Sequence, residues 1–164
     1  TETGGINLLS PKRLQTKLWT CGSADTENDA PTPVNAVDED KNGNLWVALV
    51  ERGLLKWNED SKSCVHHLFS PNDITSVSNN TLMGILIDSD NRLWAYTWGV
   101  GINGIDLNIP NNRTFKRYTR ENIPELEGDF INSACEDVIN HGIWFGSTRG
   151  VHFYDKRKLS LIHI

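Results

Sequence analysis

The chain repeats itself with a period of close to fifty residues, and this constrains its fold more than any other feature. Three short segments align on a tryptophan, with the letters NLWVA, RLWAY and GIWFG. The tryptophans are Trp46, Trp94 and Trp144, which lie 48 and 50 residues apart. A regular period of this size is typical of folds built from stacked copies of one small unit. We therefore predict that each tryptophan occupies the same packing position in its own copy.

A second anchor follows each tryptophan and begins with a glycine. The four glycines are Gly5, Gly53, Gly101 and Gly150, at spacings of 48, 48 and 49 residues. The first of them has no tryptophan before it. The chain therefore holds three whole repeats preceded by the latter part of another, and we interpret these glycines as structural residues of the repeat.

Each repeat is predicted to contain four β-strands. The first is short and apolar, as in Val34–Asp38, and the turn Asn42-Gly43 after it favours a hairpin because both residues tolerate positive φ. The second strand carries the tryptophan and is apolar on both faces, as expected for a strand between two layers. The glycine opens the third strand, and a more polar fourth strand ends the unit, as in Cys64–Phe69.

Four antiparallel strands in about fifty residues is the unit of a β-propeller blade. The fold prediction is therefore all-β, with three four-stranded blades preceded by a half-blade. The expected ranges are 1–19 for the half-blade and 31–73, 81–118 and 130–164 for the blades. Since propellers usually have more blades, we expect residues 1–164 to form an open arc of a larger propeller, of seven blades.

Composition excludes several classes of function. The 164 residues carry a net charge of −5 and no basic patch, so no nucleic-acid partner is expected. The longest apolar runs are six residues, too short for direct membrane insertion. The cysteines Cys21, Cys64 and Cys135 form no C-x-x-C pair, and we expect three small buried side chains with no metal site and no cofactor.

The pattern of an acidic residue, a turn, Gly or Asn and then Leu-Trp-Val-Ala resembles the two-component regulator propeller repeat. The best copy is 34–46, with the letters VNAVDEDKNGNLW, and the likeness covers nearly the whole chain. The resemblance implies the periplasmic sensor region of a Bacteroides-type hybrid two-component histidine kinase and response regulator. It also implies an oligosaccharide ligand, and kinase activity in another part of the parent polypeptide, so that this chain itself is not an enzyme.

Propellers usually bind ligands at one face, which is built by the loop between the second and third strands and by the connection between blades. Arg52, Trp98 and Arg149 occupy equivalent loop positions in consecutive repeats. Arginine forks bind carboxylates or sulfates, and an exposed tryptophan can stack on a sugar. Asn35 and Asn132 begin equivalent inner strands, where they either face the central channel as ligand donors or pair with backbone between blades. The alternative to ligand binding is that the loop residues are solvated charges and a half-buried aromatic ring without a binding role.

The acidic residues Asp40, Asp88 and Asp137 recur once per repeat at a turn, so we predict structural Asx turns rather than catalytic carboxylates. Two alternatives to the sensory function remain, a propeller enzyme of the streptogramin-lyase or glycoside-hydrolase kind and a purely structural scaffold. An open arc exposes the faces of its terminal blades, so we expect self-association of the chain. Because a partial arc supplies only part of a channel-facing site, we expect no measurable saccharide binding by residues 1–164 alone.

Overall fold

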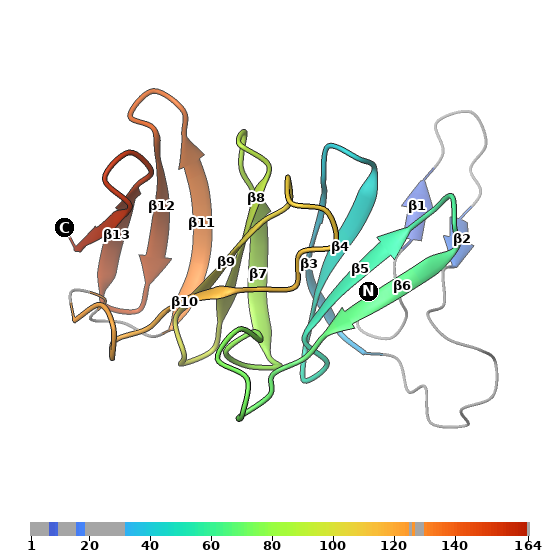
Figure 1. Cartoon of the computed structure of the whole chain (residues 1–164), viewed down its shortest axis with the longest axis horizontal. Helices are drawn as coiled ribbons and strands as arrows, with labels where there is room; N and C mark the ends of the chain where they lie inside the picture. Colours follow the sequence, from blue (N-terminus) through green and yellow to red (C-terminus); the bar gives the residue numbers. More distant parts are fainter. Residues whose placement is uncertain (1–6, 10–15, 19–31, 125, 127–129, 164) are drawn as a thin grey trace.

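The computed structural model describes residues 7–9, 16–18, 32–124, 126 and 130–163, and in these ranges the chain consists of fourteen β-strands and no helix (Figure 1). A two-stranded sheet pairs β1 (Asn7–Leu9) with β2 (Thr16–Leu18). Blade 1 contains β3 (Val34–Glu39), β4 (Asn44–Leu49), β5 (Leu54–Asn58) and β6 (Ser63–His67). Blade 2 contains β7 (Leu82–Ile87), β8 (Arg92–Thr97), β9 (Ile102–Asp106) and β10 (Lys116–Tyr118). Blade 3 contains β11 (Ile131–Asp137), β12 (Gly142–Ser147), β13 (Gly150–Asp155) and β14 (Ser160–His163).

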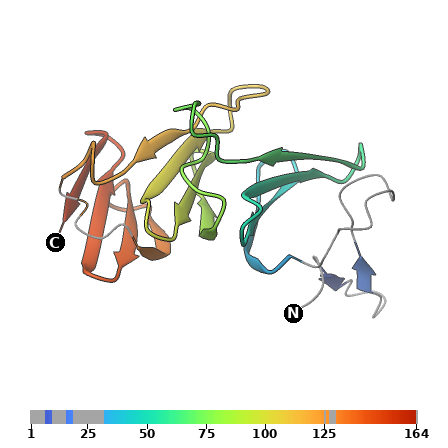
Figure 2. The same cartoon turned by 90° about the horizontal axis from the view of Figure 1, so that it is seen from below.

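The blades are antiparallel meanders that stand side by side, each next to the one that follows it in sequence (Figures 1 and 2). The first strands β3, β7 and β11 are the neighbouring inner strands. No described strand of blade 3 pairs with β1 or β2, so the ring is not closed. The predictions of an all-β fold and of an open arc of propeller blades are confirmed. The described ranges contain no helix long and apolar enough to cross a membrane.

The hairpin between the first two strands of each blade depends on one left-handed residue. These residues are Gly43, Asn91 and His141, with φ of 76°, 58° and 54°. Glycine adopts this conformation without steric cost, and asparagine tolerates it better than most residues. Blades 2 and 3 therefore keep a left-handed residue where the glycine is replaced, and the turn of blade 3 is one residue longer, since Asp137 precedes its tryptophan by seven positions and Asp88 by six.

Each blade packs its tryptophan-bearing face, here called the Trp face, against the next blade. Trp46 and Trp94 are buried, and each lies in an inter-blade core with residues of the following blade. The core between blades 1 and 2 includes Trp46, Leu54, Val77, Leu82, Leu93 and Phe115. The core between blades 2 and 3 includes Trp94, Tyr118, Leu126, Ile143, Phe145 and Tyr154. Burial of apolar area between blades, rather than within one sheet, is therefore what stabilises the arc.

The Trp face of blade 3 differs from the other two. Trp144 is only half-buried, which corrects the expectation that all three tryptophans are core residues. The strand register places Trp144 opposite Cys135 and Phe153, and Phe153 opposite Ile162, on one face of the sheet. No described strand covers this face, and Val151 and Ile162 are each 44% exposed.

Two of the cysteines depart from the expectation of small buried side chains. Cys64, on β6, is disulfide-bonded, and Cys135, on β11, is an exposed free thiol. The position of Cys21 lies outside the described residues. Sequence spacing alone does not show which cysteines meet in the fold, because a disulfide needs particular Cα separations and side-chain directions.

Candidate functional site

The loops in which the sequence predicts ligand-binding residues lie along one edge of all three blades (Figure 1). The loops 50–53, 98–101 and 148–149 connect the second and third strands of the three blades. Backbone hydrogen bonds tie them to the connections between blades, from Gly53 N to Asn80 O at 2.7 Å, from Trp98 N to Thr81 O and from Thr148 N to Phe130 O at 3.2 Å. This surface, called here the loop face, lies along the lower edge of Figure 1.

Two of the repeated glycines allow the chain to turn tightly at this face. Gly53 and Gly101 have φ of 70° and 85°. A Cβ atom on either would lie 2.4 Å from the His67 carbonyl oxygen or 2.2 Å from that of Tyr118. Any side chain would therefore push the third strand away from the fourth. Gly150 also has positive φ, and the predicted position Gly5 lies outside the described residues.

An exposed aromatic pair forms the most distinctive part of the loop face. Trp98 is 54% exposed, and its ring contacts Phe130 edge to face with 5.1 Å between the centroids. Phe130, which is 39% exposed, immediately precedes β11, so the pair joins blades 2 and 3. Gly99 has φ of 81° and allows the loop to approach the Phe130 ring. Sequence reasoning missed Phe130, although an aromatic residue at the end of a connection between blades is a usable signal.

The two candidate arginines lie on the loop face but do not contact Trp98 in any described interaction. Arg52 is half-buried, with an interaction partner of its own. Arg149 is exposed, and its backbone amide donates to Ser147 Oγ at 3.1 Å. The residue before it, Thr148, bonds to the Phe130 carbonyl, so the Arg149 loop is held beside the aromatic pair. The structure thus places Arg149 in the loop next to the pair and Arg52 one blade away.

The two asparagines of the inner strands have different surroundings. Asn35 Nδ2 donates to the carbonyl of Leu82 in the next blade at 2.7 Å. Of the two predictions for Asn35, a ligand donor or a partner of backbone between blades, the structure favours the second. Asn132 is exposed, and its Oδ1 accepts from Ser133 Oγ at 3.2 Å. Both residues lie at register shifts between the first and second strands of their blades. The Nδ2 group of Asn35 is therefore used between blades, whereas the described hydrogen bond of the Asn132 side chain lies within its own strand.

A groove of about 390 Å³ lies beside the Trp98 loop. One wall is the connection between blades 1 and 2, which Arg117 holds in place, and another is the segment 119–122 after β10. The Arg117 guanidinium donates to the carbonyls of Asp73 and Ser76, both at 2.9 Å, and lies 5.6 Å from the Phe69 ring centroid. Side-chain hydrogen bonds fix the wall before any ligand arrives, which lowers the entropy lost on binding.

The repeated acidic residues are structural, as predicted. Asp40 accepts hydrogen bonds from the backbone amides of Asn42 and Asn44 and from the Trp46 indole at 2.9 Å. Burial alone would raise the pKa of Asp40, but the hydrogen bonds from Trp46 and Asn44 outweigh it and hold the pKa below its usual value. The indoles of Trp94 and Trp144 donate to Asp88 and Asp137 in the same way. Each carboxylate thus fixes the turn and the tryptophan of its own blade.

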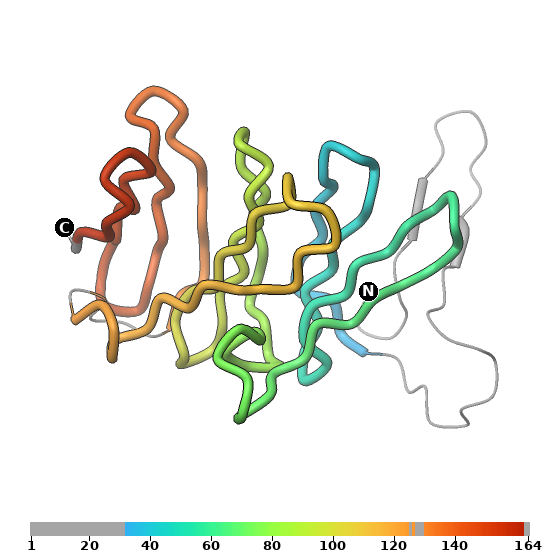
Figure 3. The backbone as a smooth tube through the Cα atoms, in the orientation of Figure 1, coloured from blue at the N-terminus to red at the C-terminus, as the bar shows by residue number. Residues whose placement is uncertain are grey.

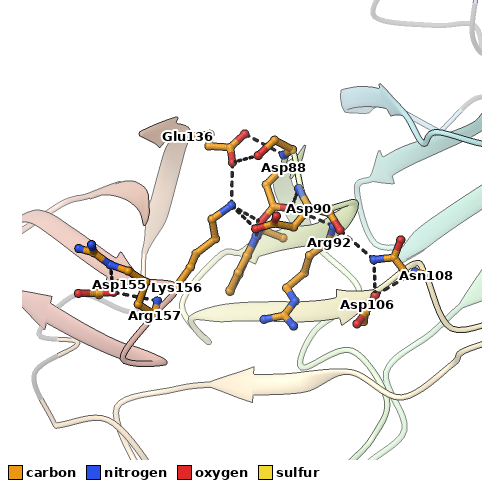
Figure 4. A network of polar contacts seen from close by, with 11 residues as sticks. Asp88, Asp90, Arg92, Asp106, Asn108, Glu136, Asp155, Lys156 and Arg157 are labelled. Carbon is orange, nitrogen blue, oxygen red and sulfur yellow. Dashed lines mark hydrogen bonds and ion pairs between the residues drawn. The ribbon is translucent and has the colours of Figure 1, made fainter. Parts of the chain in front are cut away.

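At the edge of the blades opposite the loop face, a charge network joins blades 2 and 3 (Figure 4). Lys156 Nζ lies 2.6 Å from a carboxylate oxygen of Asp90, 2.7 Å from one of Glu136 and 3.5 Å from one of Asp88. Burial would lower the pKa of Lys156, but the hydrogen bonds to Asp90 and Glu136 raise it above its usual value. The ammonium occupies the site that these acids could otherwise offer to a cation. In the described ranges, no cluster of three or more histidines, cysteines or acids could hold a metal ion.

Comparisons with solved structures agree with the fold. The extracellular domain of a protein from B. thetaiotaomicron described as a hybrid two-component system aligns with a TM-score of 0.78 and 22% identity over 100% of this chain and 22% of its own. A second such domain from B. thetaiotaomicron gives a TM-score of 0.68 and 18% identity over 98% of this chain and 23% of its own. Virginiamycin B lyase from Staphylococcus aureus gives 0.62 and 16% identity over 99% of this chain and 48% of its own.

No protein-family model and no curated protein sequence matches the chain. The chain spans less than a quarter of the length of the two extracellular domains. At these identities the likeness establishes the architecture alone, which is that of β-propeller blades arranged as in the extracellular domains of two-component systems.

Proposed function

We propose that this chain is part of the extracytoplasmic sensor region of a hybrid two-component signalling protein and that its loop face contributes to an oligosaccharide site. The observation that carries the ligand part of the proposal is the exposed Trp98–Phe130 pair, held on loops of two blades. An aromatic face in water is a stacking surface for the apolar side of a sugar ring. Arg149 in the neighbouring loop supplies hydrogen-bond donors beside it.

Two further observations support the extracytoplasmic part of the proposal. The blades align over their whole length with extracellular domains of proteins described as hybrid two-component systems. Cys64 is disulfide-bonded, and structural disulfides persist mainly in oxidising compartments such as the periplasm. Coupling to a cytoplasmic histidine kinase is the role that this placement implies.

The reading frame that encodes the chain tests the signalling part of the proposal. We expect a membrane span followed by histidine kinase and receiver sequences beyond Ile164. A reading frame that continues instead into an enzyme domain with its own catalytic residues would contradict a sensory role.

Calorimetry with a panel of oligosaccharides tests the ligand part. The polypeptide that contains the complete propeller is expected to bind one of them, while residues 1–164 alone show no measurable binding. In the complete propeller, Trp98→Ala should weaken binding by about 1–3 kcal/mol, the effect of removing an aromatic contact at the centre of a site. Ile139→Ala is the matched control, because Ile139 is 89% exposed in the hairpin between β11 and β12, at the edge of the blade opposite the loop face. Equal affinity of the two variants would remove Trp98 from the site.

A further inference from the structure

A cavity of about 140 Å³ lies at the interface of blades 1 and 2. Its floor is formed by Trp46 and His67, whose rings stack with 5.5 Å between centroids. Lys56, on β5, lines it from blade 1. Arg113 lines it from the connection between β9 and β10 of blade 2, which extends toward blade 1 (Figure 3).

The two cations of this cavity have no acidic partner in the part of the chain that the structure describes. Neither Lys56 nor Arg113 forms an ion pair or a hydrogen bond with another described residue. The Lys56 ammonium lies over the Trp46 ring, 5.4 Å from its centroid. Arg113 is exposed at the cavity mouth, and Lys56 is half-buried.

The pKa of His67 shows that these positive charges act on the same place. Burial, and after it the charges of Arg113, Lys56 and His66, together lower this pKa to about 4. His67 is therefore neutral at pH 7, and the charges of Arg113 and Lys56 add to burial in disfavouring its protonation.

Amide groups also line the cavity, and its one acid already accepts hydrogen bonds. Apolar side chains line it too, those of Val65, Leu107, Ile109 and Pro110. The side chains of Asn42 and Asn111 line the cavity and make no side-chain hydrogen bond with described residues. Asp40 also lines it, but its two oxygens accept from Asn44 and from the indole of Trp46. Asp40 stays ionised because these hydrogen bonds hold its pKa below its usual value, and they hold its carboxylate in the turn, whereas Lys56 and Arg113 form no ion pair with a described residue.

We infer that this cavity is a binding site for a tetrahedral oxyanion, a sulfate or phosphate group, held between Lys56 and Arg113. Guanidinium and ammonium groups that lie on two sides of a small cavity match such a group, and the amides supply further donors. The cavity volume of about 140 Å³ is sufficient for one such group. The anion is either a free ion or the ester group of a saccharide. Because the two cations belong to different blades, a bound oxyanion also joins blade 1 to blade 2.

Nuclear magnetic resonance of the isotope-labelled chain tests this inference. Sodium sulfate is titrated against sodium chloride at equal ionic strength, and the Trp46 indole and His67 ring signals are followed. We expect saturable shifts at both, and a rise in the pKa of His67 in the sulfate-bound state because a nearby anion favours the protonated ring. Glucose 6-sulfate, with glucose as its control, distinguishes an ester from a free ion by which of the two sulfates binds more tightly.

Arg113→Gln and Lys56→Gln should each weaken sulfate binding about tenfold, the loss expected for one charged hydrogen bond. Arg157→Gln is the matched control, because Arg157 is 66% exposed on blade 3 and changes the net charge equally. Each variant is first checked for an unchanged amide spectrum away from the cavity. Shifts that do not saturate, or that persist in Arg113→Gln with unchanged affinity, would overturn the inference, as would binding that leaves His67 unaffected.

Discussion

The two described blade interfaces place the same tryptophan in the same position and surround it with different chemistry. Between blades 1 and 2, Trp46 stacks on His67, and Phe115 contacts the imidazole edge to face. Between blades 2 and 3, Trp94 lies against Tyr118 and Tyr154, with 4.7 Å between the Trp94 and Tyr154 centroids. One interface thus contains a titratable imidazole, and the other contains a cluster of four aromatic rings, with Phe145 as the fourth.

The two interfaces also differ in their charged residues, because among the described residues only the second has a lysine that bridges acidic residues of both blades. At the second interface, Lys156 bridges Asp88 and Asp90 of blade 2 and Glu136 of blade 3. The repeat alignment puts Leu107 at the position of Lys156 and Asn42 at that of Asp90, so the first interface has no such bridge. Its cations, Lys56 and Arg113, remain open. The repeat therefore fixes the frame of each interface through its Asp–Trp pair, while the residues around that frame decide whether the space is closed or available to a ligand.

We expect the loss of stability on replacing each tryptophan by alanine to follow how fully its side chain is enclosed. Trp94→Ala is expected to lower the free energy of unfolding by about 3–5 kcal/mol, as for a large buried aromatic side chain, because its ring contacts lie on both sides of the interface. Trp46→Ala should cost less, since a cavity already adjoins its ring, and Trp144→Ala least, since that residue is half-buried. Urea unfolding of the three variants measures the order. Equal costs would mean that stability depends on the Asp–Trp hydrogen bond alone.

Lys156→Met is expected to destabilise the chain by about 3 kcal/mol, because it leaves Asp88 and Glu136 with uncompensated charge at a largely buried place. The lysine side chain is only 13% exposed. Lys158→Met is the control, since Lys158 is 72% exposed and its pairing with Asp155 should contribute at most about 1 kcal/mol. Equal effects of the two substitutions in urea unfolding would show that the network adds nothing to the second interface.

His67 should make the first interface sensitive to acid. Its pKa is about 4 in the folded chain against an ordinary value of 6.5, so the unfolded chain binds the proton more tightly. Stability is therefore full above pH 6.5 and falls as the pH drops toward 4, by about 2 kcal/mol between pH 7 and pH 5. His67→Tyr copies the Tyr118 arrangement of the second interface and should lose this part of the pH dependence. Parallel stability curves for the two proteins would refute the assignment to His67.

The repeat made the frame of the fold predictable, because its anchors are local. Gly53 is required by the approach of its own hairpin to the next strand, and Asp40 bonds to a tryptophan six residues away, so both leave a signal at a fixed spacing. The inter-blade contacts were not predictable in the same way. Phe130, the Lys156 network and the disulfide of Cys64 depend on which side chains meet across long separations, and Asn35 bonds to a carbonyl in another blade. The loop face and Trp98 could be located from the strand order, but the contact of Trp98 with Phe130 could not.

The smallest effect on stability, and the sharpest test of what an interface needs, concerns the Trp face of blade 3. This face keeps the tryptophan but has no described blade against it, and Val151 and Ile162 are exposed beside Trp144 and Phe153. Exposed apolar surface of this kind drives association, and we expect a second copy of the chain to cover it in solution. Val151→Lys with Ile162→Lys should change the free energy of unfolding of the monomer by no more than about 0.5 kcal/mol, as for exposed positions, yet shift the sedimentation profile to the monomer. Leu159→Lys is the matched control, because Leu159 is 59% exposed in the turn between β13 and β14 rather than in a strand of this face. If the unsubstituted chain already sediments as a monomer, or if the double variant still associates, then an uncovered Trp face is tolerated in water and the contacts between blades, not the apolar surface itself, determine how the arc assembles.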